Sequence, residues 1–313
     1  MAAPCNLIIV NARVLTMDPD NPRASAVAIC GNRIAAVGVD DDIRQMAAAD
    51  ARVIDAGGRT VLPGFIDSHV HLFQGAAALD FASVGGMTDL ADVKAVVLPY
   101  AAERPDEPLI LGTGAFYELF HDSDTAPRLL LDDIIADRPF ALLAADVHTV
   151  WGNTLALQKA GLFDGADNMP PGSTVVMGAD GHASGMLVEA GAMGPLLALS
   201  RTGGRDMAGY ITGADPEPPA TPAERAADKE LLLKGLDHAA AHGITAMHNM
   251  DGNVYLLELL SEREAEGRLK CRMEVPLHLK NYHPVNRLDE AAEMSARFRS
   301  EKVWSGRVKM FMD

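Results

Sequence analysis

The hydrophobic pattern of the chain changes after about sixty residues. In the first part, short apolar runs alternate with turn-forming residues, which predicts strands at 6–15, 26–29, 33–37 and 52–54. The pairs Gly31-Asn32 and Gly57-Gly58 are suited to two-residue hairpin turns. Short strands separated by frequent turns are typical of a β-sandwich, which we expect at residues 1–60.

From Gly64 onward the pattern repeats strand and then helix. The clearest helix begins at Thr221, where Thr221, Pro222 and Glu224 form a capping box with proline at the first helical position, and Gly243 ends it. Further helices are expected at 253–266 and 284–299, and barrel-type strands at 65–72, 244–248, 271–279 and 308–312. Four such strands predict an α/β chain that covers half of a (β/α)8 TIM barrel.

Two segments interrupt this repeat. Residues 79–199 contain strand-like runs at 109–111 and 140–144, and a helix after Asn153 that stops at Gly161. Residues 201–221 are rich in glycine and proline, which indicates either a mobile lid or an inert surface excursion. The expected order is a first barrel strand and loop (61–78), an inserted substrate-side subdomain with this loop (79–222), and barrel strands two to four (223–313).

Composition narrows the class of protein. With 313 residues, of which 48% are hydrophobic and 22% charged, the chain can bury a large core. The formal charge of −16 disfavours nucleic acid or an anionic membrane as a partner. The N-terminal residues lack the pattern of a secretory signal. Three cysteines at unrelated spacings, Cys5, Cys30 and Cys271, predict a cytoplasmic, reducing location without a disulfide or a cysteine-based zinc site.

Two histidines, His69 and His71, lie two residues apart at the end of the strand predicted at 65–72. Alternate side chains of a strand point to one face and successive residues rise about 3.3 Å, so both imidazoles can converge on one cation. Phe65 and Ile66 before them predict a strand that is buried on both faces. The pair alone is a weak signal, and two hydrogen-bonded histidines are the alternative.

The segment from Pro63 to His71, Pro-Gly-Phe-Ile-Asp-Ser-His-Val-His, resembles the first barrel strand of the amidohydrolase superfamily. The likeness extends from about residue 7 to residue 313 and is greatest to the YtcJ-like branch, amidohydrolase family 3, which includes N-substituted formamide deformylases. It implies a barrel with a small β-sandwich domain and a metal-dependent hydrolase. The other segments that carry it are 146–157, 185–189, 243–245 and 308–311.

Lys309 acquires a role only through this resemblance, because a lysine at a strand end is ordinarily solvated. Related enzymes carry a carboxylated lysine at the end of the fourth strand. The resemblance therefore implies two divalent ions, with zinc the first expectation, that are bound by His69 and His71 and bridged by Lys309. It also implies that a metal-activated hydroxide hydrolyses an amide-type C–N bond. A mononuclear deaminase-like hydrolase and a catalytically degenerate binding or scaffold relative are the alternatives.

Other residues are expected around this centre. His148, Trp151 and Asn153 belong to a cluster that matches the family, so we expect them in the substrate pocket. His248 ends the second barrel strand and is expected either to bind substrate or to form hydrogen bonds at the rim. Asp67 is expected to orient a histidine or the strand end. Glu189 matches the family without a derivable role, and we expect ordinary structural positions for His121, His182, His238, His242, His278 and His283.

The resemblance also implies residues that this sequence does not contain. Two further histidines from strands five and six and a general-base aspartate from strand eight would lie beyond Asp313. A half-barrel would leave a strand edge unpaired and its apolar interior open to water. We therefore expect a fragment, or one half of a barrel that another chain completes. The expected partners are a small-molecule substrate and a second copy in a homodimer, with no nucleic acid and no membrane.

Overall fold

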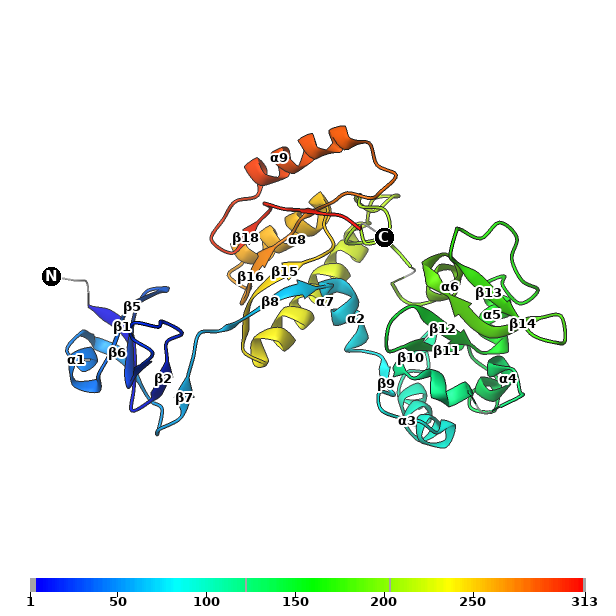
Figure 1. Ribbon diagram of the computed structural model, residues 1–313, viewed down its shortest axis with the longest axis horizontal. Coiled ribbons are helices and arrows are strands. Elements are labelled where there is room, and N and C mark those ends of the chain that lie inside the picture. The colour runs from blue at the N-terminus through cyan, green and yellow to red at the C-terminus, as the bar shows by residue number, and fades with distance from the viewer. Residues whose placement is uncertain (1–3, 122, 203, 312–313) are drawn as a thin grey trace. The chain divides into compact units, whose positions relative to one another are not determined.

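The computed structural model describes residues 4–121, 123–202 and 204–311 (Figure 1). The chain forms two compact units. One comprises Met1–Ile66 with Gly243–Ala246, and the other comprises Asp67–His242 with Met247–Asp313. Mixed α/β structure is found, as predicted. No helix of the described residues combines the length and the hydropathy that crossing a membrane requires.

The N-terminal unit is built from two small sheets and one short helix. Strands in the order β5-β4-β1-β6 form the first sheet, and β3-β2-β7 form the second. Ile8, Val10 and Ile43 are buried in a small core beside the first sheet. The elements are β1 (Cys5–Val10), β2 (Arg13–Leu15), β3 (Arg23–Ala24), β4 (Ala26–Cys30), β5 (Arg33–Gly38), α1 (Asp40–Arg44), β6 (Ala47–Asp55) and β7 (Thr60–Val61).

The turns of this unit differ from the sequence prediction in two places. The strand predicted at 6–15 is divided, because Asn11 takes a left-handed φ of 52° that ends β1. Gly31-Asn32 forms the predicted hairpin turn between β4 and β5. Gly57-Gly58 also forms a turn, but no hairpin: β6 pairs with β1, whereas β7 pairs with β2 in the other sheet.

Cys5 and Cys30 form a disulfide, so the expected absence of a disulfide is wrong. The two cysteines lie on β1 and β4, which are neighbouring antiparallel strands. Their Cα atoms are 4.2 Å apart, although they are separated by 25 residues in the sequence. Spacing along the chain does not reveal such a pair, because strand register brings the residues together. The cysteine argument for a reducing compartment is thereby removed.

Residues 82–197 form the predicted insertion around one six-stranded sheet, in the order β13-β14-β12-β11-β10-β9. β9, β10 and β11 are parallel, and the remaining pairs are antiparallel. The strands are β9 (Ala82–Ser83), β10 (Ile110–Ala115), β11 (Phe140–Ala144), β12 (Thr149–Gly152), β13 (Thr174–Met177) and β14 (Ala183–Val188). The helices are α3 (Leu90–Ala102), η1 (Tyr117–Phe120), α4 (Pro127–Asp132), α5 (Thr154–Lys159) and α6 (Glu189–Leu197).

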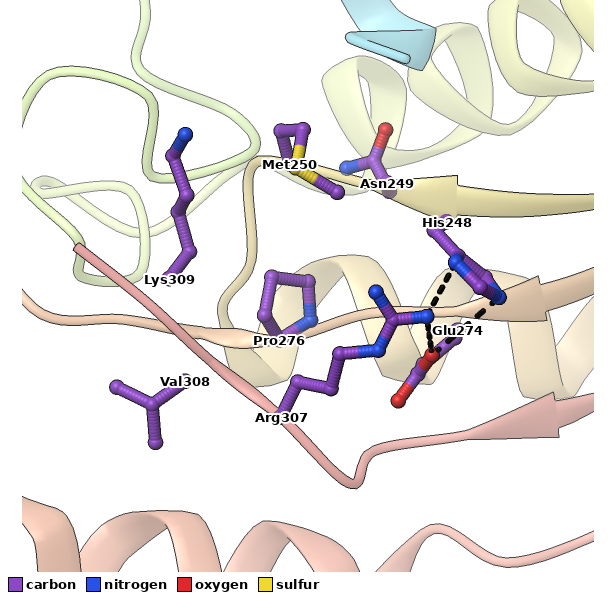
Figure 2. Close-up of a pocket in the computed structure, with 8 residues that line it drawn as sticks. All are labelled: His248, Asn249, Met250, Glu274, Pro276, Arg307, Val308 and Lys309. Atoms are coloured by element: carbon purple, nitrogen blue, oxygen red, sulfur yellow. Dashed lines mark hydrogen bonds and ion pairs between the residues drawn. The ribbon is translucent and has the colours of Figure 1, made fainter. Parts of the chain in front are cut away.

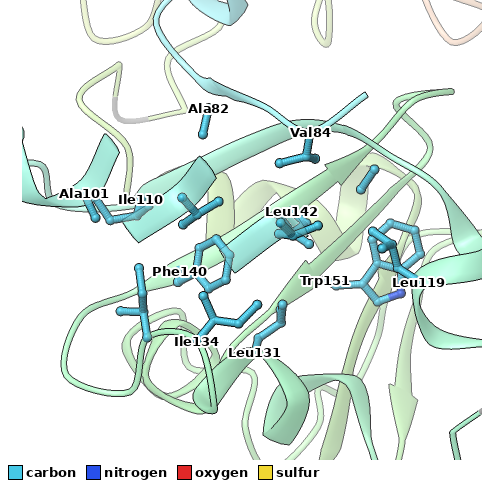
Figure 3. Close-up of a cluster of buried hydrophobic side chains, with 14 of the residues drawn as sticks. Ala82, Val84, Ala101, Ile110, Leu119, Leu131, Ile134, Phe140, Leu142 and Trp151 are labelled. Atoms are coloured by element: carbon cyan, nitrogen blue, oxygen red, sulfur yellow. The ribbon is translucent and has the colours of Figure 1, made fainter. Parts of the chain in front are cut away.

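Two hydrophobic cores stabilise the insertion. Figure 3 shows the first, in which Phe140, Leu142 and Trp151 pack among residues of α3 and α4. The second includes Leu109, Leu157 and Leu187. Adjacent residues of β11 and β12 contribute to different cores, as expected of strands whose alternate side chains point to opposite faces.

The barrel-type strands form a sheet in the order β8-β15-β16-β18, which is also their order along the chain. A further parallel pair, β17 and β19, continues the third and fourth strands. Figure 1 shows α7 and α8 beside this sheet. The elements are β8 (Phe65–Val70), α2 (Leu72–Ala78), α7 (Pro222–Ala241), β15 (Ile244–Asn249), α8 (Val254–Ala265), β16 (Arg272–Glu274), β17 (Leu277–His278), η2 (Val285–Arg287), α9 (Leu288–Arg297), β18 (Val303–Trp304) and β19 (Val308–Lys309).

In this region the helices predicted from the sequence agree well with the structure, and the predicted strands agree less well. The capping box at Thr221 is present. The strand predicted at 271–279 is divided before Pro276, which has no N–H to donate to a neighbouring strand. β18 was not predicted. The expectation that Phe65 and Ile66 are buried is wrong: they are 55% and 61% exposed, because β8 is an edge strand of its sheet.

Candidate metal centre

His71 and Asp251 form a close polar contact at the end of the first barrel-type strand. His71 Nδ1 lies 2.8 Å from Asp251 Oδ1, and the His71 side chain is 31% exposed whereas the carboxylate is fully buried. An ionised carboxylate only accepts hydrogen bonds, so Nδ1 carries the proton in this contact. Nε2 of His71 is then left with the lone pair that binds a cation.

The chain after β15 fixes Asp251 in this position. Asn249 Oδ1 accepts the backbone N–H of Leu72 at 2.9 Å, and Asn249 Nδ2 donates to the Asp251 carbonyl at 2.6 Å. Glycine is required next, because a Cβ at Gly252 would lie 1.7 Å from the Pro276 carbonyl oxygen. Asn253 then caps α8 through a 2.8 Å contact with the N–H of Leu256.

His69 lies beside His71, with ring centroids 5.6 Å apart. The side chain of His69 is exposed. Asp67 Oδ1 accepts the backbone N–H of His69 at 3.0 Å. Asp67 thus holds the strand end, one of its two expected roles, and Asp251 is the carboxylate that orients a histidine.

The segment 204–221 contributes Tyr210 to this region. The Tyr210 ring packs edge-on against His71, with centroids 5.3 Å apart, and its backbone carbonyl accepts a hydrogen bond from Lys280 Nζ. Burial raises the pKa of the Tyr210 hydroxyl, with a smaller effect from Asp251. The described part of this glycine-rich segment therefore packs against candidate site residues.

His278, Lys280 and Lys309 form a second group, at the ends of β17 and β19. His278 and Lys309 are register partners in these parallel strands. The ring of Phe311 lies 5.3 Å from the His278 ring, 5.1 Å from Lys280 Nζ and 4.6 Å from Lys309 Nζ. Burial, with a further effect from Lys280, lowers the pKa of His278 to about 4. Burial also lowers the pKa of Lys280. This group concentrates basic side chains in a poorly solvated place.

A cavity of about 80 Å³ is lined by residues at the ends of β15, β16 and β19, among them His248 and Lys309 (Figure 2). His248 Nδ1 contacts the Arg307 guanidinium, and Nε2 lies 3.6 Å from Glu274 Oε2. Arg307 also forms a 2.5 Å ion pair with Glu274. Figure 2 shows the Lys309 side chain directed away from these three residues. His248 therefore makes the rim contacts that were one of its two expected roles.

The cluster at 146–153 divides into an exposed pair and two core residues. His148 Nδ1 lies 3.0 Å from Glu189 Oε1, and both side chains are exposed. Trp151 is 1% exposed and lies in the hydrophobic core. Asn153 is fully buried, caps α5, and bonds the backbone of the preceding loop through its amide nitrogen. Neither Trp151 nor Asn153 reaches the surface of the described chain, whereas His148 does.

The side chains of His69, His71 and Asp251 fit part of a metal site. Within the described residues, no three side chains of the His, Cys, Asp and Glu types gather as a metal-binding group. Two adjacent imidazoles are nevertheless present, and the buried Asp251 leaves one carboxylate oxygen without a described hydrogen-bond partner. This arrangement is that of metal-binding histidines oriented by a carboxylate. His69 and His71 therefore fit one side of a metal site.

The comparison with protein families decides the identity of the chain. A model described as the amidohydrolase family matches residues 52–313. The chain belongs to the amidohydrolase family.

Two relatives place this amidohydrolase more closely. It is 35% identical over 190 residues to an N-substituted formamide deformylase of Arthrobacter pascens. The aligned residues make up 60% of this chain and 35% of that protein. It is 24% identical over 177 residues to the putative amidohydrolase YtcJ of Bacillus subtilis. That alignment covers 56% of this chain and 33% of the relative. The predicted likeness to the YtcJ-like branch and to formamide deformylases is confirmed.

A solved structure confirms the relationship at the level of the fold. The amidohydrolase matches an uncharacterized metal-dependent hydrolase from Pyrococcus furiosus with a TM-score of 0.59 and 21% identity. The match covers 96% of this chain and 55% of that structure. The chain thus spans about a third of the curated relatives and about half of the solved one.

Sequence reasoning missed Asp251, Lys280 and Tyr210. A signal for Asp251 was available, because polar residues directly after a barrel-type strand lie at the catalytic rim of such folds. Lys280 had a similar position after the third strand. Tyr210 had no such signal, since its position depends on how an irregular segment packs.

Proposed function

We propose that this amidohydrolase is part of a metal-dependent hydrolase that cleaves an amide-type C–N bond of a small molecule. The observation that carries the proposal is the pair His69 and His71, with His71 held by the buried carboxylate of Asp251. A formamide deformylase among the relatives supports the class of bond. The proposal places the site in a (β/α)8 barrel, to which this chain contributes strands one to four.

In this proposal each residue of the chain has a defined part. His69 and His71 would hold zinc, and a carboxylated Lys309 would complete the part of a two-ion site that this chain supplies. When bound, the metal supplies a Lewis acid for the carbonyl and an activated water molecule. Asp251 keeps the Nδ1 proton on His71 and thereby fixes the direction of its Nε2 lone pair.

The substrate side of the proposal rests on His148 and His248. His148 is exposed and paired with Glu189, and His248 lines the cavity that Lys309 also lines. The proposed contribution of Trp151 and Asn153 to the substrate pocket is indirect, because Trp151 packs in the hydrophobic core and Asn153 bonds the backbone of the loop before β11. A substituted formamide is the first substrate class to test, because of the relative's name.

The remaining parts of the barrel belong to the proposal as well. Val308, Met310 and Phe311 are 40%, 46% and 41% exposed, and β8 and β18 are edge strands of their sheet. Later barrel strands, from this protein or another chain, would cover such apolar side chains and supply the general-base aspartate. A homodimer completes the proposal. A cytoplasmic location also belongs to it, although the Cys5–Cys30 disulfide removes the cysteine argument for that location.

Hydrolysis by the full-length protein tests this function. We expect metal-dependent release of formate from N-substituted formamides, which chelation abolishes and added zinc restores. His69→Ala and Lys309→Ala should each abolish it, whereas His238→Ala, an exposed histidine on α7, should leave it unchanged. Unchanged turnover in either of the first two variants would reject the role assigned to that residue. A retained rate in Lys309→Ala with one ion bound would favour the mononuclear alternative.

A further inference from the structure

The group formed by His278, Lys280 and Lys309 contains a feature that the proposed metal ligands leave unexplained. His278 is fully buried, and neither of its ring nitrogens makes a hydrogen bond of good geometry with the described residues, although the Gly209 backbone lies near enough to act on the ring. Buried polar atoms are nearly always paired, so an unpaired buried imidazole calls for a partner that is added later.

The surroundings of His278 indicate the charge of that partner. Lys280 Nζ and Lys309 Nζ lie 5.1 and 4.6 Å from the centroid of the same ring, that of Phe311. No ion pair of either lysine is found among the described residues, and Asp206 and Asp251 act on the Lys280 charge from beyond ion-pair distance. Two ammonium groups near one another and near a buried ring are repulsive unless an anion joins them.

The strand register places Lys309 beside His278. His278 and Lys309 are opposite one another in the parallel pair of β17 and β19, so their side chains extend to the same side of the sheet. Lys280 follows His278 by two residues. Figure 2 shows Lys309 directed away from Glu274 and Arg307, so the nearby ion pair does not occupy its amine.

We infer that His278 and Lys280 are positioning residues that recognise a carbamate on Lys309. The inference rests on the proposed function, which requires that carbamate. The neutral Lys309 amine donates its lone pair to the carbon of dissolved carbon dioxide, so that an N–C bond forms and one C=O electron pair moves onto oxygen. The nitrogen then releases one proton to solvent. The product, with one negative charge over two oxygens, accepts an N–H of His278 and pairs with the Lys280 ammonium.

Carbamate formation in the full-length protein tests this inference. Metal-free protein is equilibrated with increasing ¹³C-labelled bicarbonate and then loaded with zinc, and the Lys309 carbamate is measured by ¹³C NMR and the bound zinc by elemental analysis. Lys280→Met should raise the bicarbonate concentration for half-maximal carbamate about tenfold, because a charge-assisted contact is lost. His278→Leu should act in the same direction.

Matched variants separate this role from a general effect on folding. Lys280→Arg keeps the charge and should stay within about threefold of the wild type. Lys270→Met removes an exposed lysine that pairs with Asp237 and should have no effect. If Lys280→Met and His278→Leu fill with carbamate at the wild-type bicarbonate concentration, the inference is overturned and the proposed function stands. A wild-type protein that binds two zinc ions without any carbamate would overturn both the proposed bridge and the inference.

Discussion

Asp251 Oδ1 lies 2.8 Å from His71 Nδ1, and the two residues are 180 positions apart in the sequence. The contact joins the ends of the first two barrel-type strands. It defines which nitrogen of His71 is available to a cation. The carboxylate accepts a hydrogen bond from the protonated Nδ1, so Nε2 remains free for the cation. The remaining oxygen of Asp251 is buried without a described hydrogen-bond partner.

Asp251→Asn should weaken zinc binding about 10- to 100-fold, as replacement of carboxylates behind metal-binding histidines usually does. The amide retains the volume of the side chain but neither its charge nor its preference for the Nδ1 proton. Competition of the full-length protein with a zinc chelator measures the change. Asp237→Asn, at an exposed ion pair on α7, is the matched control. Equal zinc affinity in both variants would mean that Asp251 has only a structural role.

Asn153→Ala should destabilise the protein by about 3 kcal/mol, because it removes a helix cap and leaves buried backbone groups without partners. Asn153 Oδ1 accepts the N–H groups of Ala156 and Phe140 at 2.8 and 3.1 Å. Chemical denaturation measures the loss, with the exposed Gln158→Ala on the same helix as the control. A large rise in KM at unchanged stability would instead give Asn153 a direct contact with substrate.

These two asparagine and aspartate positions show what the sequence can and cannot predict. The sequence predicts a helix directly after Asn153, and the structure shows this helix with Asn153 as its cap. The assignment of Asn153 to a pocket came from its presence in a family motif, which does not reveal burial. The position of Asp251 after the second barrel-type strand marks it as a rim residue, but its contact with His71 requires β8 and β15 to be neighbours, and that information lies in strand order. The Cys5–Cys30 disulfide was missed for the same reason.

His148→Gln and Glu189→Gln should each raise KM for the substrate with a smaller change in kcat, if the exposed pair contacts substrate as proposed. Glu189 and Val147, the residue before His148, have φ values of 64° and 60°. Such values are unusual for these side chains and are often found at functional sites. Steady-state kinetics measure the effect. His182→Gln breaks a similar exposed pair with Asp164 and should leave KM unchanged. The same rise in all three variants would point to a nonspecific effect.

The stability that Glu262 contributes should decrease as the pH falls. Hydrogen bonds from Lys229 and then Arg225 lower the pKa of Glu262, so the folded state holds this carboxylate ionised at a pH where the unfolded chain is already protonated. The contribution is therefore present above the unfolded pKa of 4.5 and is lost as the pH falls through the lower folded value. Unfolding midpoints of wild type and Glu262→Gln should converge between neutral and acidic pH. A constant difference would contradict this.

The number of zinc ions bound by the full-length protein decides whether His69, His71 and Lys309 belong to a binuclear site. Elemental analysis of metal-loaded protein, in parallel for the wild type and for Lys309→Ala, measures it without reference to any substrate. We expect two ions per chain in the wild type and no more than one in Lys309→Ala, because the bridge is removed. One ion or none in the wild type, or two ions retained in Lys309→Ala, would contradict the binuclear site that His69, His71 and Lys309 are proposed to form.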